Sequence, residues 1–363
     1  MDEITTMHVI GSRQFGGAER FFLRLVSALR EAGHPTVAVA RRDTPVAEAL
    51  DRLGGRNHFL SFANSWDFAT RGALRGLLRY YRPAVVQTYM GRATRLMRKP
   101  RGLPSFHVAR LGGYYRIDGY YRHCDAWIGN TRGLHRYLLE QGLPPARCTM
   151  IGNFVAPAPR PAPSDRIALR HRHGIPADAT LLVAVGRMID KKGFQDLLPA
   201  VAMLCGDFRG LHLLLVGDGP RRRELEAKAA ALGIGERVHW AGWQPDPDAH
   251  YACSDLFVCP SRHEPLGNVI LEAWSHGLPL VSTRSDGAAE LVRDGETGIL
   301  CEVASPAELA AGIRTLLEMG PTARERLGRA GREELRRAHG PEAITQRYLN
   351  FYRGLTQRVA ATV

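Results

Sequence analysis

The sequence lacks the long apolar runs that membrane-spanning proteins need. No stretch of about 18 apolar residues occurs among its 363 residues, so we expect no transmembrane helix. The first residues combine neither a basic segment nor an apolar segment, so no secretory signal is predicted. The six cysteines include no C-x-x-C pair, which is typical of free thiols in a reducing compartment. We therefore expect a cytoplasmic protein.

Motifs of several enzyme classes are also absent. The chain contains no G-x-x-x-x-G-K-[ST] phosphate loop and no G-x-S-x-G nucleophile motif. The glycines that follow the first apolar segment, Gly11, Gly16 and Gly17, do not have the G-x-G-x-x-G spacing of dinucleotide-binding domains. No H-E-x-x-H motif or paired Cys/His set is present, so we predict no metal site and no cofactor.

Lysine is scarce, and the positive charge is unevenly distributed. Residues 1–160 carry 24 Lys and Arg against 11 Asp and Glu, whereas the remainder carries 25 of each. The choice of Arg over Lys can reflect genomic composition alone. The asymmetry between the halves instead predicts an anionic partner for the first half, such as phospholipid headgroups, a phosphorylated acceptor or nucleic acid.

A dense basic cluster lies in this half, between residues 92 and 101. Arg92, Arg95 and Lys99 would share one face if the stretch is helical. One interpretation is a solvated basic face. Another is peripheral binding to the anionic inner face of a cytoplasmic membrane. Nucleic-acid binding is less favoured, because no interleaved aromatic binding motif accompanies the charge.

The length and the hydrophobic pattern predict an α/β protein of two domains. A chain of this length exceeds one typical core. Short apolar segments alternate with helical patterns in both halves, which predicts two doubly wound, Rossmann-like domains facing across a cleft. The predicted strands are residues 7–10, 36–40, 84–87, 106–109 and 126–129 in the first half, and 181–185, 211–216, 238–240, 256–259 and 280–282 in the second.

Alternate prolines mark the predicted domain boundary. Pro157, Pro159, Pro161 and Pro163 favour an extended, stiff connector. We place an N-terminal acceptor-side domain at residues 1–160 and a C-terminal donor domain at 161–340. Residues 341–363 have a helical pattern that could pack on either half, including back on the first.

The most informative stretch runs from Glu264 to Glu272. A polar loop with Gly267 and Asn268 leads into an apolar helical pattern, and the free N–H groups at a helix start favour an anion. Glu264 precedes this helix start and Glu272 lies about one turn inside the helix. Two carboxylates around a phosphate-accepting helix end suit a nucleotide-sugar. The alternative is an ordinary amphipathic helix with a solvated Glu272.

Basic residues follow a second strand. Arg187, Lys191 and Lys192 come after the predicted strand at 181–185, at the edge of the sheet where ligands bind. A guanidinium and one of the ammonium groups suit a pyrophosphate, although a solvated basic turn is the alternative. Gly16 and Gly17, before the first helix, allow close backbone approach to an anion.

These stretches together resemble the retaining glycosyltransferases of family 4, which have the GT-B fold. The resemblance covers nearly the whole second half of the chain and the first thirty residues of the first half. It implies transfer of a sugar from a nucleotide-diphospho-sugar. The matching residues are 16–19, 186–187, 191–193, 216–220 and the E-x₇-E motif at 264–272, followed by 277–281 and 287–298.

The resemblance also implies residue roles. Arg187 and Lys192 would hold the donor diphosphate and stabilise it as a leaving group without a divalent metal, while Glu264 would contact the transferred sugar and Glu272 the ribose. Retention would come from front-face attack, with a departing phosphate oxygen taking the acceptor proton. The remaining donor contacts implied are backbone groups of Leu266, Gly267, Asn268 and Val269, the closing loop at Gly16 and Gly17, and Gly242 and Trp243 near the base.

The acceptor side departs from the family pattern. Many relatives carry a histidine at the end of a first-domain strand, but His107 lies too early for that position, which Leu111 or Gly112 would occupy. Arg110, Tyr114 and Gln87 are candidate acceptor contacts, with a packing role equally open. We expect a glycan or glycolipid acceptor of the cell envelope, of lipopolysaccharide type. A nucleotide-sugar epimerase or a glycogen-synthase-like enzyme on the same fold is the alternative.

Overall fold

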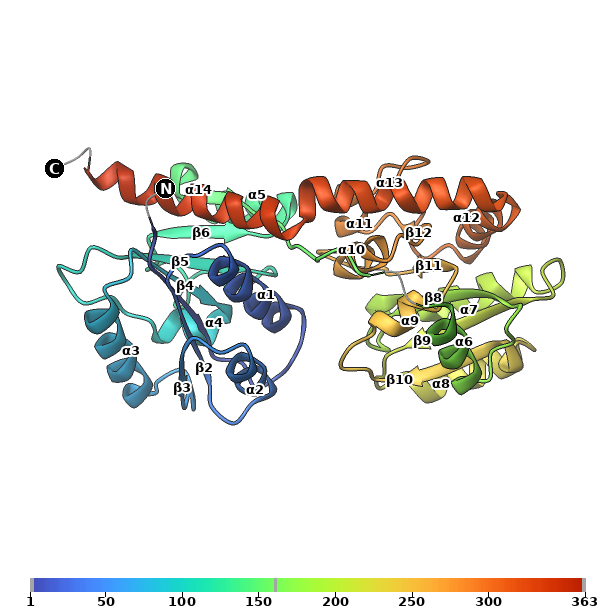
Figure 1. Cartoon of the computed structure of the whole chain (residues 1–363), viewed down its shortest axis with the longest axis horizontal. Coiled ribbons are helices and arrows are strands. Elements are labelled where there is room, and N and C mark those ends of the chain that lie inside the picture. Colours follow the sequence, from blue (N-terminus) through green and yellow to red (C-terminus); the bar gives the residue numbers. More distant parts are fainter. Residues whose placement is uncertain (1–2, 160–161, 361–363) are drawn as a thin grey trace. The chain divides into compact units, whose positions relative to one another are not determined.

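The computed structural model describes residues 3–159 and 162–360. The chain forms two compact units. Unit 1 contains the chain up to Phe154 and the segment from Pro341 onward, and unit 2 contains Val155–Gly340. Each unit is a parallel β-sheet with helices packed against it (Figure 1), so the prediction of two doubly wound α/β units is confirmed.

The sheet of unit 1 has the order β3-β2-β1-β4-β5-β6-β7, and every pair of neighbours is parallel. The strand order reverses between β1 and β4, as in dinucleotide-binding sheets. The strands are β1 (Thr6–Ile10), β2 (Thr36–Arg41), β3 (Arg56–Leu60), β4 (Val85–Tyr89), β5 (Phe106–Leu111), β6 (Ala126–Gly129) and β7 (Cys148–Met150), and the helices are α1 (Gly17–Glu31), α2 (Pro45–Arg52), α3 (Phe68–Tyr81), α4 (Met90–Leu96) and α5 (Arg132–Glu140), with a 3-10 turn η1 (Pro145–Arg147).

Helix α4 ends before the last residues of the basic cluster. Arg92 and Arg95 lie on α4, whereas Lys99 lies beyond it and forms an ion pair with Asp125 at 2.6 Å. The predicted shared helical face of Arg92, Arg95 and Lys99 is therefore wrong. The helix stops because Met97 adopts an extended conformation.

Helix α14 (Pro341–Ala360) belongs to unit 1, although it follows unit 2 in the chain. It packs against α1, and Ile344, Tyr348 and Tyr352 are fully buried in the core that α1 also lines. Buried Tyr hydroxyls need hydrogen-bond partners. The hydroxyl of Tyr352 donates to Gln87 Oε1 at 2.7 Å, and the hydroxyl of Tyr348 accepts from Arg110 Nε at 3.0 Å.

The sheet of unit 2 repeats the same topology, with the order β10-β9-β8-β11-β12-β13. Its strand order reverses between β8 and β11. The strands are β8 (Thr180–Val185), β9 (Leu211–Val216), β10 (Val238–Gly242), β11 (Leu256–Cys259), β12 (Leu280–Thr283) and β13 (Ile299–Cys301), and the helices are α6 (Pro163–Arg172), α7 (Phe194–Leu204), α8 (Arg222–Ala231), α9 (Asp248–Ala252), α10 (Asn268–Ser275), α11 (Asp286–Leu291), α12 (Pro306–Glu318) and α13 (Pro321–His339), with 3-10 turns η2 (Asp190–Lys192) and η3 (Gly235–Arg237).

The division between the units falls earlier than the predicted boundary at residue 160. The backbone N–H of Val155 donates to His339 O at 3.2 Å, and that of Ala158 donates to Ser275 O at 3.1 Å. These bonds attach the start of the proline-containing stretch to unit 2. Of the four prolines, Pro161 lies outside the described residues.

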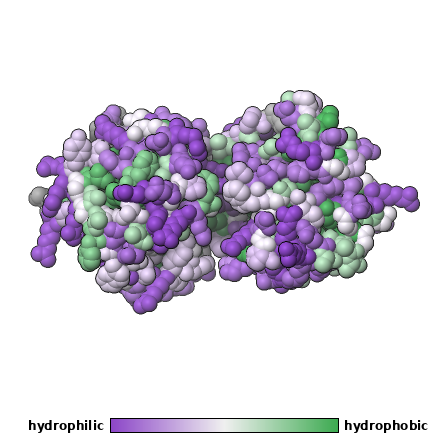
Figure 2. All heavy atoms as spheres, turned by 90° about the horizontal axis from the view of Figure 1, so that it is seen from below, coloured by the Kyte–Doolittle hydropathy of each residue, from purple (hydrophilic) through white to green (hydrophobic). Residues whose placement is uncertain are grey.

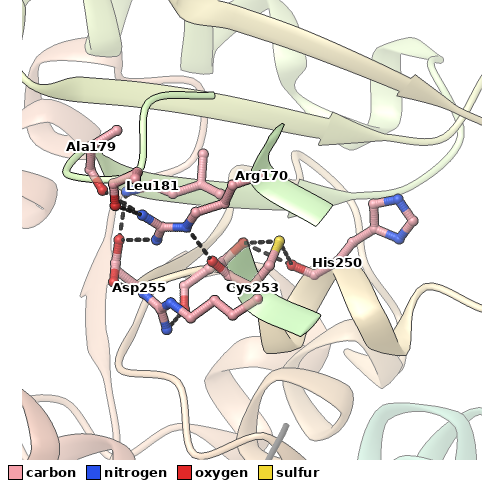
Figure 3. A network of polar contacts seen from close by, with 9 residues as sticks. Arg170, Ala179, Leu181, His250, Cys253 and Asp255 are labelled. Atoms are coloured by element: carbon pink, nitrogen blue, oxygen red, sulfur yellow. Dashed lines mark hydrogen bonds and ion pairs between the residues drawn. The ribbon is translucent and has the colours of Figure 1, made fainter. Parts of the chain in front are cut away.

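A buried arginine fastens α6 to the sheet of unit 2 (Figure 3). Arg170 donates to the carbonyls of Ala177, Ala179 and Cys253 at 3.1, 2.9 and 2.9 Å, and to Asp255 at 2.8 Å. The same carboxylate accepts from the N–H of Leu181 at 2.7 Å. The network therefore ties α6 to the start of β8 and to the turn before β11.

We predict that Arg170→Ala lowers the free energy of local unfolding around β8 and β11 by about 3 kcal/mol, because it leaves buried acceptors without a donor. Hydrogen-exchange mass spectrometry of peptides from these strands measures this value. The control is Arg166→Ala, which removes the more exposed partner of Asp255 and should cost less than about 1 kcal/mol. Equal losses in the two variants would contradict the prediction.

Candidate active site

Two loops meet in unit 2 where its strand order reverses, between β8 and β11. In doubly wound sheets, ligands bind at the carboxyl edge at this position. The loop after β8 contains η2, and the loop after β11 leads into α10. The N–H of His263 donates to Lys191 O at 3.1 Å. A Cβ atom on Gly193 would lie 1.8 Å from the carbonyl oxygen of Pro260, so only glycine permits this approach.

Lys192 and Glu264 form an ion pair across these loops. Their side chains are 21% and 12% exposed. Burial acts to lower the pKa of Lys192, but the carboxylate of Glu264 and further anionic groups offset this, and the pKa is raised overall. The ammonium group is therefore charged at neutral pH. The structure selects Lys192, not Lys191, as the buried lysine of this loop.

The start of α10 is held by close backbone contact with α11. Gly267 is the N-cap residue of α10 and has a φ of +63°, which suits glycine. The N–H of Gly287 donates to Glu264 O at 2.7 Å. A Cβ atom on Gly287 would lie 2.6 to 2.7 Å from backbone atoms of Glu264, Leu266 and Gly267. The predicted phosphate-accepting helix start is thus a tightly fixed turn.

Glu272 lies inside α10 and is buried. Its carboxylate accepts a hydrogen bond from the hydroxyl of Tyr251 at 3.1 Å. Burial, together with this carboxylate, raises the pKa of Tyr251 well above its ordinary value. Glu272 also contributes to raising the pKa of Lys192. The structure therefore brings Lys192, Glu264 and Glu272 into one electrostatically coupled group, and the alternative of a solvated Glu272 is wrong.

The other donor-side residues lie at the same edge of the sheet. Arg187 follows β8 and is exposed, and no ion pair of its side chain occurs within the described residues. Gly242 ends β10, has a φ of +70° and accepts from the N–H of Gly217 at 2.8 Å. Trp243, the next residue, is 62% exposed, so its indole ring is accessible to a ligand.

The candidates of unit 1 divide into buried and exposed residues. Gly16 and Gly17 are exposed at the start of α1, where Glu19 accepts the N–H of Gly16 at 2.9 Å. Gln87 is fully buried and bonded to Tyr352. Arg110 is 3% exposed, lies 3.6 Å from the ring centroid of Phe21 and donates to Asn153. For Gln87 and Arg110 this geometry favours the packing role over acceptor contact.

Tyr114 remains half exposed, on the loop after β5. Its ring lies against Tyr137 in an edge-to-face arrangement, with 5.4 Å between the centroids. Leu111, one of the two residues expected at the position of the family histidine, is buried at the end of β5. Tyr114 is therefore the one acceptor-side candidate of the three whose ring reaches solvent.

One cluster in unit 1 offers metal-ligand chemistry that the sequence did not indicate. Ligand atoms of His107, His123 and Cys124 lie within 4.8 Å of one another. In the present arrangement His107 Nε2 is 2.9 Å from the hydroxyl of Thr88, and His123 Nε2 is 3.0 Å from a backbone carbonyl. Burial and neighbouring cationic groups lower the pKa of both histidines. The cluster belongs to unit 1, whereas Lys192 and Glu264 belong to unit 2.

Comparison with known families identifies both halves of the chain. Residues 165–334 match the family described as glycosyl transferases group 1, and residues 15–158 match the family described as glycosyltransferase family 4. Among solved structures, the chain is similar to the Anabaena protein HepE in complex with UDP and glucose. The TM-score is 0.81 at 19% identity, covering 96% of this chain and 99% of HepE. This likeness shows the GT-B fold.

Curated relatives of similar length share more sequence. The lipopolysaccharide core biosynthesis glycosyltransferase LpsE of Rhizobium meliloti (strain 1021) is 36% identical over 340 residues, which cover 92% of this chain and 95% of LpsE. LpsD of the same organism is 34% identical over 348 residues, covering 94% and 97%. With both halves matched and these relatives aligned over almost their full length, the chain belongs to the group 1 glycosyl transferases and is a glycosyltransferase of GT-B fold.

Proposed function

We propose that the protein transfers a sugar from a nucleotide-diphospho-sugar to a lipopolysaccharide-type acceptor, with retention of anomeric configuration. The observation that carries the proposal is the ion pair of Lys192 and Glu264 beside the start of α10. It combines a cation for phosphate, a carboxylate for hydroxyl groups and a helix N-terminus in one place. LpsE and LpsD, named for lipopolysaccharide core biosynthesis, support the acceptor class.

In this proposal the donor diphosphate takes the place of Glu264 as the partner of Lys192. Arg187 adds a second cation from the same loop, and both stabilise the negative charge that develops on the leaving phosphate. Glu264, released from the lysine, accepts hydroxyl groups of the transferred sugar. Glu272 accepts hydroxyls of the ribose, where Tyr251 already holds its carboxylate in position.

The backbone groups of residues 266–269 complete the proposed donor site. They lie at the turn that Gly267 and Gly287 hold in place, and a helix start of this kind favours phosphate oxygens. Trp243 is proposed to lie against the base, because this residue comes directly after β10 of the same sheet and its ring is exposed. HepE, with UDP and glucose bound, is a structural neighbour that supports a nucleotide-sugar donor.

The proposal includes no metal. Two cations of the chain, Lys192 and Arg187, are available to neutralise the diphosphate, which is the task that a divalent ion performs in metal-dependent enzymes. The acceptor hydroxyl would lose its proton to a departing phosphate oxygen, so that the protein supplies positioning and electrostatic support and no covalent nucleophile.

We further propose a peripheral, cytoplasmic location on an anionic membrane. Within the described residues, none of the helices combines the length and apolar character that crossing a bilayer demands. On unit 1, Trp66 and Phe68 are 63% and 72% exposed, and the guanidinium of Arg95 lies 4.4 Å from the Trp66 ring centroid. Figure 2 shows hydrophobic patches among hydrophilic residues on one face of this unit. Aromatic rings with arginines suit a headgroup layer.

We predict that Glu264→Ala and Lys192→Ala each lower the kcat of sugar transfer by at least about 100-fold, because each removes a charged group from the donor site. Transfer to a lipopolysaccharide core fragment, scored by mass spectrometry, measures the effect, and NMR of the product tests retention. Lys191→Ala is the matched control, since this lysine is exposed. Near-normal turnover in both active-site variants would remove the site assignment.

Metal removal gives a second prediction. Transfer by the purified protein should be unchanged after dialysis against excess EDTA, because Lys192 and Arg187 supply the positive charge at the diphosphate. The rate of product formation before and after dialysis is compared. A loss of activity that Mg²⁺ or Mn²⁺ restores would contradict the proposal.

Vesicle binding tests the membrane proposal. The protein should co-sediment with vesicles that contain anionic phospholipid, and salt should weaken this binding. Trp66→Ala should reduce it, whereas Trp243→Ala, which removes an exposed tryptophan of unit 2, should not. Equal binding to neutral and anionic vesicles is the outcome that opposes the proposal.

A further inference from the structure

An arginine-lined pocket opens in unit 1 at the carboxyl ends of β1, β2 and β3. Its volume is about 340 Å³, a size that accommodates a single sugar-sized group. Arg41 ends β2 and Arg42 follows it, Ser61 follows β3, and Arg13 lies on the loop after β1. The lining consists of Arg13, Arg41, Arg42, Asp43, Thr44, Ser61 and Ala63.

The positive charge of this pocket is only partly offset by the protein, because Asp43 in the lining and Asp67 nearby act on Arg41 without forming an ion pair with it. Within residues 3–159, the side chains of Arg13, Arg41 and Arg42 form no ion pair with a carboxylate, and neither does that of neighbouring Arg92. Burial, and then the charges of Arg13 and Arg92, lower the pKa of Arg41, although Asp67 and Asp43 act to raise it. Guanidinium groups held together in this way favour an anion, which would relieve their mutual repulsion.

The nearby carboxylate of Asp67 forms hydrogen bonds with its own loop and with the start of α3, and not with the pocket arginines. It accepts hydrogen bonds from the N–H of Ala63 at 2.9 Å and of Thr70 at 2.9 Å, and from the hydroxyl of Ser61. Although burial acts to raise it, these bonds lower the pKa of Asp67. Its role is to cap α3 and hold the loop before it, so it does not close the pocket with an ion pair.

A backbone carbonyl fixes Arg41 and its neighbour Arg92. The carbonyl oxygen of Phe62 accepts from Arg41 Nη1 and, at 3.2 Å, from Arg92 Nη1. Phe62 has a φ of +41° and Asp43 a φ of +56°. Left-handed backbone at non-glycine residues is strained and clusters at functional sites. The fully buried ring of Phe62 rests on Gly11, where a Cβ atom would lie 2.8 Å from it.

We propose that this pocket binds an anionic substituent of the acceptor, a phosphate or a carboxylate carried on a sugar. The inference rests on the proposed function, since it assigns the pocket to the acceptor. The lining contains no aromatic ring for a nucleotide base, and the donor-side cations lie in unit 2. Forked guanidinium groups match both oxyanions in geometry. The acceptor is therefore a negatively charged glycan, selected by Arg13, Arg41 and Arg42.

The test uses the full-length protein with three probes, a hexose 6-phosphate, a hexuronate and glucose, at equal ionic strength. Binding is measured by calorimetry and by protection of arginines from phenylglyoxal, read by mass spectrometry. We expect the anionic sugars to bind and to protect Arg13 and Arg42, while glucose does neither. Preference for the phosphate or for the uronate identifies the substituent.

Variants then locate the binding. Arg13→Gln and Arg42→Gln change exposed side chains, and each should weaken binding of the anionic sugar by about tenfold, which is the loss of one charge-assisted hydrogen bond. Arg79→Gln, an exposed arginine on α3, is the matched control and should bind normally. Circular dichroism confirms that the variants fold.

A parallel titration with nucleotide-sugars separates this inference from the proposed function. Binding of a nucleotide-sugar without binding or protection by either anionic sugar would overturn the pocket assignment and leave the proposed function standing. Anion binding that Arg13→Gln and Arg42→Gln do not weaken would overturn it as well. Anion binding that depends on these arginines, in a protein that binds no nucleotide-sugar, would support the pocket and oppose the proposed function.

Discussion

The contact between the ammonium group of Lys192 and the carboxylate of Glu264 is the interaction around which the candidate active site is built. It joins the loop after β8 to the loop after β11 at the reversal of the strand order. Removing either partner would leave a largely buried charge alone, which is costly. In the proposed function the donor diphosphate takes the place of Glu264 as the partner of Lys192, so that the ammonium group keeps a counter-charge.

Glycines make this contact possible. Gly193 lies against Pro260, and Gly287 lies against the turn at Gly267, at distances that a side chain would not allow. Steric crowding therefore requires glycine at both positions, whether or not a ligand is bound. The backbone of the loops thus holds the charged groups in place. Electrostatic preorganisation requires charged groups that are positioned in this way before the reaction begins.

The sequence predicted the fold class, and it predicted that Glu264 precedes a helix and that Glu272 lies inside it, because these features depend on local patterns. Buried central strands read as continuous apolar runs, and the residues from Glu264 to Glu272 carry their spacing with them. Three edge strands were not predicted: β7 and β13 have only three residues each, and β3 is partly exposed along its length. Arg110 and Gln87 were predicted to contact the acceptor, but they bind Tyr348 and Tyr352 instead. The sequence does not reveal these contacts, because the tyrosines lie more than 200 residues further along the chain. The arginine pocket was also missed, because three separate loops form it.

The placement of α14 has a consequence for how the protein is made. Unit 1 needs Tyr348 and Tyr352 to fill its core and to satisfy Arg110 and Gln87, but these residues are translated after all of unit 2. During translation, unit 2 can therefore complete its core before unit 1 does. Until α14 has been made, the apolar residues of α1 that pack against it stay uncovered. Domains usually fold in the order of their synthesis, but here the unit that is made first can complete its core only after helix α14, at the far end of the chain, has been made.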